Sequence, residues 1–259
     1  MGEQNFQSIQ AAADASTFTI TLNKPPLNII DIPMIDEICD ALRQAEADPH
    51  IGIILFRGAG PKGFSAGVSV QDHTPERVGE LIPKFDDIFR LLSATDKVTM
   101  AGVHGFCLGG GFELAAMCDL VVATENATFG QPEIKLGQLA PVGVILLPHL
   151  VGYRKAAELL FTGATIGARQ AEALGLVNQV VPNDQLPQAL QSLAGQLSTQ
   201  SRAILRYTKS FLRRASGLEF DNLLKESEQL FFNSVAQTQD SKEGIYAFLE
   251  KRSPRWTHS

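Results

Sequence analysis

The sequence predicts an α/β protein in which a core of strands and helices is followed by a helical region. Short apolar or β-branched runs alternate with helix-like patterns over residues 17–181. From about residue 184 onward, only helical patterns are found. The 259 residues include 44% apolar and 19% charged side chains, which excludes a disordered, collagen-like or coiled-coil protein.

Turn residues and periodicity mark the first elements. Residues 17–22 alternate and are β-branched, which predicts a strand, and the prolines within residues 24–26 end it. Residues 34–47 carry apolar side chains on one face, which predicts a helix. Pro33 suits the first turn of this helix, and Asp31 or a nearby polar group suits its cap.

The middle of the chain continues the alternation. Short apolar runs predict strands at residues 51–56 and 98–103. Between them, residues 76–92 have a helical pattern in which Pro83 predicts a break or a kink. A further helix is expected to begin at about Gly110, directly after a run of glycines.

Two more strands, at residues 120–123 and 177–181, are expected before the helical region. We divide the chain into a core that holds the site, residues 1–195, and a C-terminal helical part, residues 196–259. The helical part has more aromatic side chains than a small cap needs for its own core, so we expect it to form subunit contacts.

Charge, cysteines and hydrophobicity exclude several classes of protein. Twenty-two basic against 28 acidic residues leave a net charge of −6, which argues against a nucleic-acid partner. Cys39, Cys107 and Cys118 fit neither a disulfide framework nor a metal site, so we expect buried, reduced thiols. Neither a secretory signal nor an apolar run of membrane-spanning length is found, so we expect a cytoplasmic protein without a membrane partner.

Residues 58–63 match the G-x-G-x-x-G pattern of dinucleotide sites, and they follow a predicted strand. Such a site needs a helix that opens on the glycines and an acidic residue about 20 residues later, at the end of a second strand. Residues 64–68, which follow the glycines, are not helix-like. The region near Glu80 is helix-like, so Glu80 does not lie at the end of a strand. We therefore interpret these glycines as a turn.

Two glutamates are candidates for acid–base chemistry. Three glycines at residues 109–111 open a helix, where unpaired N–H groups and the helix dipole suit a developing oxyanion. Glu113 in the first turn is either a dipole partner or, in apolar surroundings, an acid–base catalyst. Glu133 lies in a loop-like segment, where a solvated carboxylate is the simpler interpretation. We interpret His73 as a helix cap and His104 as a buried, hydrogen-bonded residue. Neither interpretation requires a catalytic role.

Five short segments, each weak by itself, occur in a specific order along nearly the whole chain. They are residues 26–28 (PLN), 64–67 (FSAG), 105–114 (GFCLGGGFEL), 130–133 (GQPE) and 247–252 (AFLEKR). Together they resemble the crotonase superfamily, also called the enoyl-CoA hydratase/isomerase family. The resemblance implies a crotonase-like spiral of ββα units with a C-terminal helical trimerisation region, assembled as homotrimers or homohexamers.

The resemblance also implies a site for an acyl-CoA thioester. The backbone N–H groups of Ala66 and Gly110 would form an oxyanion hole, and Glu113 and Glu133 would match the two glutamates of the hydratases. Lys251 would approach the CoA phosphates, often from a neighbouring subunit. The residues implied to bind substrate are Pro26, Leu27, Ala66, Gly67, Val68, Ser69, Val70, Gly110, Val142 and Lys251.

Water addition fits these residues chemically. Adding water to a double bond conjugated to a thioester places negative charge on the carbonyl oxygen, and losing one preformed donor there typically costs about 2.7–4 kcal/mol. One carboxylate must activate water while another group delivers a proton to carbon. We assign water activation mainly to Glu113 and proton delivery mainly to Glu133, with sharing between them possible in principle. No metal and no redox cofactor is required, and CoA is part of the substrate.

Two departures from the family pattern bear on the substrate. Ser69 stands where many members have Asp, and residues 138–148 form an apolar wall in place of a glycine-rich helix start. The wall either borders an unusual acyl group or is ordinary core packing. With residues 67–73, it looks like the cyclohexa-1,5-diene-1-carbonyl-CoA hydratases of anaerobic aromatic degradation, which form 6-hydroxycyclohex-1-ene-1-carbonyl-CoA. The alternatives are a general short-chain enoyl-CoA hydratase, an enoyl-CoA isomerase and a non-catalytic oligomeric CoA-fold binding protein.

Overall fold

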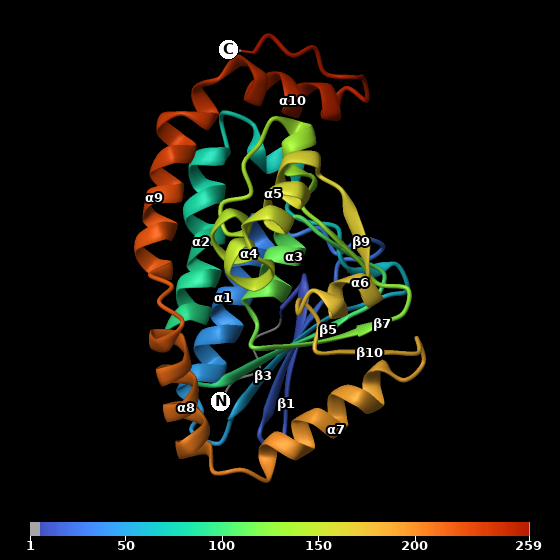
Figure 1. The fold of residues 1–259 in the computed structure, drawn as a ribbon, viewed down its shortest axis with the longest axis vertical. Coiled ribbons are helices and arrows are strands. Elements are labelled where there is room, and N and C mark those ends of the chain that lie inside the picture. The colour runs from blue at the N-terminus through green and yellow to red at the C-terminus, as the bar shows by residue number, and fades with distance from the viewer. Residues whose placement is uncertain (1–5, 259) are drawn as a thin grey trace.

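Two sheets organise the chain in the computed structural model, which describes residues 6–258 (Figure 1). The large sheet has the strand order β1-β2-β3-β5-β7-β10. Its first pair is antiparallel, and all its other neighbours are parallel. Its strands are β1 (Ile9–Asp14), β2 (Thr17–Leu22), β3 (Ile53–Gly58), β5 (Val98–Val103), β7 (Leu120–Thr124) and β10 (Gln179–Val181).

The small sheet has the strand order β4-β6-β8-β9, with only the last pair antiparallel. Consecutive strands alternate between the sheets, because β3, β5 and β7 lie in the large sheet and β4, β6 and β8 in the small one. A helix follows the second strand of a pair, α2 after β4 and α3 after β6. The expected spiral of ββα units is therefore confirmed. The strands of the small sheet are β4 (Gly63–Ser65), β6 (Phe106–Leu108), β8 (Thr128–Gly130) and β9 (Thr165–Gly167).

Helices flank the sheets, with α1 packed on α2 and α2 packed on α9 (Figure 1). The helices of the core region are α1 (Ile32–Ala47), α2 (Val78–Ala94), α3 (Gly110–Met117), α4 (Gly143–Val151), α5 (Tyr153–Thr162) and α6 (Ala168–Ala173). Short 3₁₀ helices are η1 (Val70–His73), η2 (Pro132–Leu136) and η3 (Val235–Gln237). Within residues 6–258, none of the helices is both long and apolar enough to cross a bilayer.

The helical region after residue 184 is confirmed, with α10 lying across one end of the molecule in Figure 1. Its helices are α7 (Leu186–Ser198), α8 (Arg202–Ala215), α9 (Phe220–Asn233) and α10 (Gln239–Leu249). One face of α8 exposes apolar side chains, among them Tyr207 and Phe211. The predicted boundary at residue 195 and the predicted subunit contacts stay predictions.

The beginning of α1 shows how the sequence sets a helix. Asp31 is the cap, because its side chain accepts a hydrogen bond of 3.2 Å from the N–H of Met34. Pro33 occupies the first turn, as predicted. In α2, by contrast, Pro83 causes no break, because one helix runs from Val78 to Ala94, and the alternative of a kink stays a prediction. Buried side chains on both sides of the proline, Ile82 and Phe85, anchor one continuous helix in the core.

The three cysteines are free and buried, as predicted. Burial raises the pKa of the Cys39 thiol to about 12. Burial also raises the pKa of Cys107 and of Cys118 well above the ordinary value of a thiol. All three thiols are therefore protonated and unreactive in the folded chain.

Candidate active site

The first turn of α3 positions Glu113 in a closely packed environment. A Cβ atom on Gly110 would lie 2.4 Å from Cγ2 of Val68 and 2.6 Å from Cζ of Phe85, so only glycine fits there. Glu113 follows one turn later and is 2% exposed. The glycines thus allow the helix to begin against neighbouring segments, and they bring Glu113 into the interior.

Backbone amides from the segment before α4 hold the Glu113 carboxylate. Its Oε1 accepts hydrogen bonds from the N–H of Val142 at 3.0 Å and of Gly143 at 2.7 Å. Burial raises the pKa of Glu113 to about 7, although these two N–H groups favour its charged form. A carboxyl group with this pKa is half ionised near neutral pH, which suits a general base.

Glu133 lies in η2, and it faces the same cleft as Glu113. A Cβ atom on Gly109 would lie 2.6 Å from Oε1 of Glu133, so this glycine leaves room for the carboxylate. Burial, and then repulsion from Glu113, raise the pKa of Glu133 well above its ordinary value. The Gln131 side-chain amide is oriented with its nitrogen toward Glu133. This nitrogen donates to both carboxylate oxygens of Glu133, at 2.9 and 3.2 Å. The solvated-carboxylate interpretation of Glu133 is therefore wrong.

The cleft shared by the two glutamates has a volume of about 790 Å³. Most of the residues implied to bind substrate line it, whereas Pro26, Val142 and Lys251 do not. Val142 is fully buried, and it contributes to the site through its backbone N–H. The predicted residues that line the cleft are Leu27, Ala66, Gly67, Val68, Ser69, Val70, Gly110, Glu113 and Glu133.

The oxyanion donors differ from the expectation at one position. The Ala66 N–H donates to the carbonyl oxygen of Leu27 at 2.9 Å, and the Gly67 N–H donates to Oγ of Ser65 at 3.1 Å. Neither amide is free for a substrate oxygen. The N–H groups of Val68 and Gly110 donate to no acceptor within residues 6–258.

Val68 and Gly110 also lie against each other, since the Val68 side chain occupies the space beside the Gly110 α-carbon. Both residues line the cleft. We therefore replace the Ala66 amide by the Val68 amide as the partner of Gly110 in the candidate oxyanion hole. The sequence identified the segment, but the hydrogen bonds of the fold decide which amide in it is free.

The cleft also has walls that the sequence reasoning missed. Gln138 fixes α10 over the site, because its Nε2 donates to the carbonyl oxygen of Ser241 at 3.0 Å and to its Oγ at 2.8 Å. The apolar wall comes partly from the predicted segment 138–148, through Leu139 and Pro141. The remaining apolar walls come from α2, η2 and α10, through Leu81, Ile82, Phe85, Leu136, Ile245, Phe248 and Leu249.

The two histidines have different surroundings. His73 lines the cleft, and its Nδ1 is 2.8 Å from the carbonyl oxygen of Ser69. Burial lowers the pKa of His73, so its ring is neutral at pH 7. His104 lies outside the cleft, with its Nε2 2.8 Å from the carbonyl oxygen of Gly60, so the predicted hydrogen bond is found. The predicted burial is wrong, because the His104 side chain is only partly covered by its neighbours.

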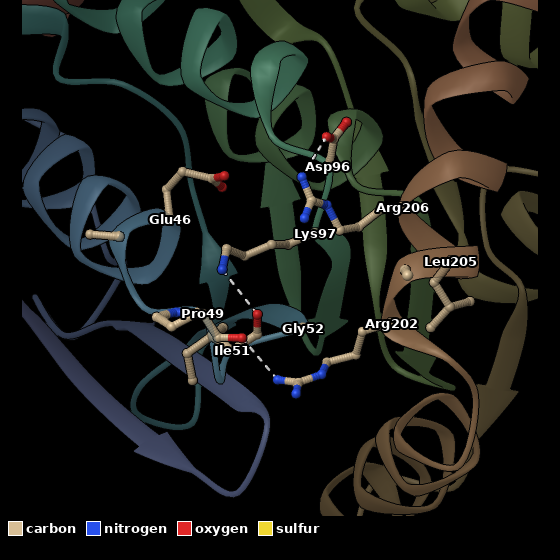
Figure 2. Close-up of a pocket in the computed structure, with 11 residues that line it drawn as sticks. Glu46, Pro49, Ile51, Gly52, Asp96, Lys97, Arg202, Leu205 and Arg206 are labelled. Atoms are coloured by element: carbon tan, nitrogen blue, oxygen red, sulfur yellow. Dashed lines mark hydrogen bonds and ion pairs between the residues drawn. The ribbon is translucent and has the colours of Figure 1, made fainter.

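A second cavity, of about 550 Å³, lies between α8 and residues 46–52, where Lys97 points toward Ile51 and Arg206 toward Asp96 (Figure 2). Its basic side chains are already paired. Lys97 donates from Nζ to the carbonyl oxygens of Asp48 and Ile51, at 2.8 and 2.9 Å. Arg202 donates to two carbonyl oxygens in the same segment. The Arg202 bonds attach α8 to the core, and we assign the cavity a structural role.

Replacing Lys209 by Met is expected to destabilise the protein without changing its activity. Lys209 is 5% exposed, pairs with Asp119 at 2.7 Å and donates to the Lys97 carbonyl oxygen at 2.5 Å. Losing these bonds in a buried position should lower the free energy of unfolding by about 1–3 kcal/mol, measured by urea denaturation. Arg206→Met removes an exposed ion pair with Asp96 and should change the free energy of unfolding by only about 0–1 kcal/mol. Equal effects of the two substitutions on the free energy of unfolding would contradict a stabilising role for the buried Lys209 bonds.

Comparison with known proteins is consistent with this geometry. The family model described as enoyl-CoA hydratase/isomerase matches residues 12–259. The chain is 39% identical over 245 residues to the probable enoyl-CoA hydratase echA8 of Mycobacterium leprae, covering 92% of this chain and 93% of that protein. It is 33% identical over 243 residues to the cyclohexa-1,5-dienecarbonyl-CoA hydratase of Thauera aromatica, covering 94% of this chain and 93% of that protein.

A solved structure has the same fold. The crystal structure of an enoyl-CoA hydratase from Mycobacterium avium subsp. paratuberculosis K-10 superposes with a TM-score of 0.88 at 27% sequence identity. The superposition covers 98% of this chain and all of that one, 100%. The similarity therefore extends through the core and the helical region alike.

Proposed function

Because the chain belongs to the enoyl-CoA hydratase/isomerase family, we propose that it is a hydro-lyase that adds water to the double bond of an enoyl-CoA thioester. One observation carries this proposal. Two glutamates with raised pKa values and two unpaired backbone amides face a single cleft with apolar walls. A thioester oxygen bound by the amides would leave the conjugated double bond between the two carboxyl groups.

In the proposed mechanism, the amides of Val68 and Gly110 stabilise the negative charge that develops on the thioester oxygen. Ionised Glu113 takes a proton from water as the water oxygen bonds to the β-carbon. The electron pair of the double bond moves toward the thioester, and protonated Glu133 delivers the proton that completes the addition. In a simple enoyl-CoA this proton goes to the α-carbon. In a cyclic 1,5-dienoyl-CoA it goes to the far end of the conjugated diene, so that the remaining double bond stays at the α-carbon. The elements of water are added and no oxidation state of the protein changes, so we propose that neither a metal nor a redox cofactor takes part.

The assignment of base and acid is supported by the charge arrangement of the pair. Two carboxyl groups that repel each other in a buried site share a proton, which resides on the group with the higher pKa. Two backbone amides favour the ionised form of Glu113. The charge of Glu113 raises the pKa of Glu133 further, and the Gln131 amide only partly opposes this. At neutral pH, this places the proton on Glu133 and leaves Glu113 able to accept one.

We predict that kcat/KM falls as the pH drops below about 7. The pKa of Glu113 is raised to about 7, and its ionised form is the one required, so activity is lost as that form is protonated. The decline should approach about tenfold for each pH unit on the acid side. Initial rates with a fixed enoyl-CoA between pH 5 and 8 would test this, and a flat profile over that range would contradict Glu113 as the base.

For the acyl group, we propose cyclohexa-1,5-diene-1-carbonyl-CoA, with 6-hydroxycyclohex-1-ene-1-carbonyl-CoA as product and a role in anaerobic aromatic degradation. Support comes from the apolar walls formed by Phe85, Leu139 and Pro141, which suit a ring more than a polar group. The 33% identity to the Thauera aromatica hydratase supports it as well. A general short-chain enoyl-CoA is the second candidate, favoured by the 39% identity to a protein named only as an enoyl-CoA hydratase.

Product analysis by mass spectrometry with a panel of enoyl-CoA thioesters tests these proposals together. A gain of one water with cyclohexadienoyl-CoA, at a higher kcat/KM than with crotonyl-CoA, is the expected result. Preference for crotonyl-CoA would replace the alicyclic substrate by the general one. A shifted double bond without a mass gain would indicate an isomerase, and binding without any product would indicate a CoA-fold binding protein.

We further propose that the chain assembles as a homotrimer or homohexamer with cytoplasmic localisation. The exposed apolar face of α8 supports the assembly, because a patch with Tyr207 and Phe211 at 75% and 64% exposure is unusual on a monomer. In such an assembly, Lys251 of one subunit could reach CoA phosphates held by another. Sedimentation velocity measures the mass of the species in solution, and a monomer at micromolar concentration would refute the assembly.

A further inference from the structure

Asp86 is a buried carboxyl group that the proposed mechanism does not use. It lies in α2 with 0% of its surface exposed, and neither of its carboxylate oxygens has a hydrogen-bond partner in the described part of the chain. A buried charge without partners is strongly disfavoured, and buried polar groups without partners are rare in folded proteins. A side chain in such a position needs an explanation other than packing.

The nearest cation does not neutralise Asp86 by itself. Nη2 of Arg90 is 4.0 Å from Oδ2 of Asp86, beyond hydrogen-bond distance. Arg90 donates instead to Asp87 at 2.8 Å and to Glu228 at 2.6 Å. One guanidinium group therefore serves three carboxyl groups, and Asp86 is the one that it contacts least.

Helices α2 and α9, which carry Asp86 and its charged neighbour Glu228, each contact a segment that holds Glu113. The preceding residue in α2, Phe85, packs against Gly110 in the first turn of α3, one turn before Glu113. On the other side, Ser227 of α9 donates to the carbonyl oxygen of Pro141 at 3.1 Å. The residue after Pro141 donates its N–H to Glu113. The helix that carries Asp86 and the helix that carries Glu228 thus both contact the segments that hold Glu113.

The charges around Asp86 come from each neighbouring element. Its own helix contributes Arg90 and Asp87, α9 contributes Glu228, and α3 contributes Glu113. Charged groups on the other elements packed against α2 are paired elsewhere, since Asp36 of α1 bonds to Lys84 and Asp72 of η1 to Arg77. Burial raises the pKa of Asp86 to about 8, with Arg90 opposing and the surrounding carboxylates adding to the shift.

We propose that Asp86 is a positioning residue whose protonated, neutral carboxyl group allows Glu113 to carry the negative charge that the reaction requires. Three carboxyl groups in one buried region cannot all ionise without mutual repulsion. When Asp86 loses its proton at alkaline pH, its charge opposes the charge on Glu113 and the charge that develops on the thioester oxygen. Ionisation of Asp86 therefore lowers turnover at alkaline pH, in addition to the loss of the proton from Glu133. This inference rests on the proposed function.

The test compares Asp86→Asn with Asp87→Asn. The first substitution keeps the shape of the side chain and removes its ionisation. The second is the matched control, because Asp87 is the next residue, pairs with the same Arg90 and has a half-exposed side chain. In the wild type and in Asp87→Asn, kcat/KM should decline above about pH 8. In Asp86→Asn the plateau should extend upward, so that the ratio of variant to wild type rises at least about fivefold between pH 7 and 9.5.

A second readout does not depend on turnover. Carbon-13 NMR of carboxyl-labelled protein without substrate follows Glu113, whose signal is assigned by its loss in Glu113→Gln. The titration is run in Glu133→Gln, which removes the coupled titration of Glu133. There the Glu113 signal should shift in two steps, one at its own ionisation and one at the ionisation of Asp86, and the second step should be missing when Asp86→Asn is added. A chain that hydrates no enoyl-CoA refutes the proposed function, but the NMR titration still decides this inference.

A purely structural role for Asp86 would give a different pattern. Because the pKa of Asp86 is higher in the folded than in the unfolded chain, its burial destabilises the fold increasingly as the pH rises from the unfolded value toward about 8. Asp86→Asn should therefore raise Tm more at pH 8 than at pH 5, whether Asp86 positions the charge of Glu113 or has only a structural role. A higher Tm with pH–rate profiles and Glu113 titrations that superimpose on the wild type would overturn the proposal.

Discussion

Replacing Glu113 by Gln is expected to lower kcat by about 10²–10⁴-fold, the usual contribution of a general base. The substitution removes the charge that accepts a proton from water. It keeps the side-chain oxygen that accepts hydrogen bonds from Val142 and Gly143, so the local fold should be retained. Glu133→Gln removes the proposed proton donor and should have an effect of similar size.

Steady-state kinetics and CoA binding by calorimetry distinguish loss of chemistry from loss of binding. Both Gln variants should bind CoA as the wild type does, because neither carboxylate is required to hold the nucleotide part of the substrate. The double variant should be little slower than the slower single one, since residues that act in one step are not additive. Turnover at the wild-type rate in either single variant would refute the catalytic role of that glutamate.

Replacing Gly110 by Ala is expected to lower kcat/KM by about 10²–10³-fold, the range reported when one oxyanion donor is lost. The new Cβ would overlap with Val68 and Phe85, at 2.4 and 2.6 Å. Val68, Phe85 or the backbone of Gly110 must move to relieve this contact. We expect the movement to change the spacing of the Val68 and Gly110 amides that bind the thioester oxygen. KM alone should change less than kcat, because the amides act mainly on the charge formed in the transition state.

Gly79→Ala is the matched control for Gly110→Ala. Gly79 is also a glycine near the start of a helix, but a Cβ there has no neighbour within 4 Å. Its substitution should leave kcat unchanged and should stabilise α2 by about 0.5–1 kcal/mol. If Gly110→Ala keeps full activity with an unchanged melting temperature, the Val68 and Gly110 amides are not the oxyanion donors.

Local patterns predicted several of the longer elements, but α4 and α5 were missed. Residues 98–103 form β5 at the predicted bounds, and residues 17–22 form β2. The three-residue strands of the small sheet were missed, because three residues cannot display an alternation. Residues 9–14 were also missed, since this largely exposed edge strand contains three alanines and only one β-branched residue.

The candidate site could be predicted where a motif fixes the backbone and not where tertiary packing decides. Glu113 follows three glycines at a helix start, and that pattern was sufficient to single it out. The choice between the Ala66 and Val68 amides depends on a hydrogen bond to Leu27, a residue nearly forty positions away. The sequence did not indicate that Asp86 is buried, because one acidic residue in an amphipathic helix normally faces solvent. The contribution of α10 to the cleft likewise depends on long-range contacts with η1 and η2.

The three enclosed thiols give this protein an internal reporter of unfolding. Cys39, Cys107 and Cys118 are at most 8% exposed, and their raised pKa values keep them as the unreactive thiol form. Iodoacetamide should therefore modify them only in molecules that have opened. The rate of alkylation at each cysteine would then measure how often α1, the small sheet and the end of α3 come apart, without any added label.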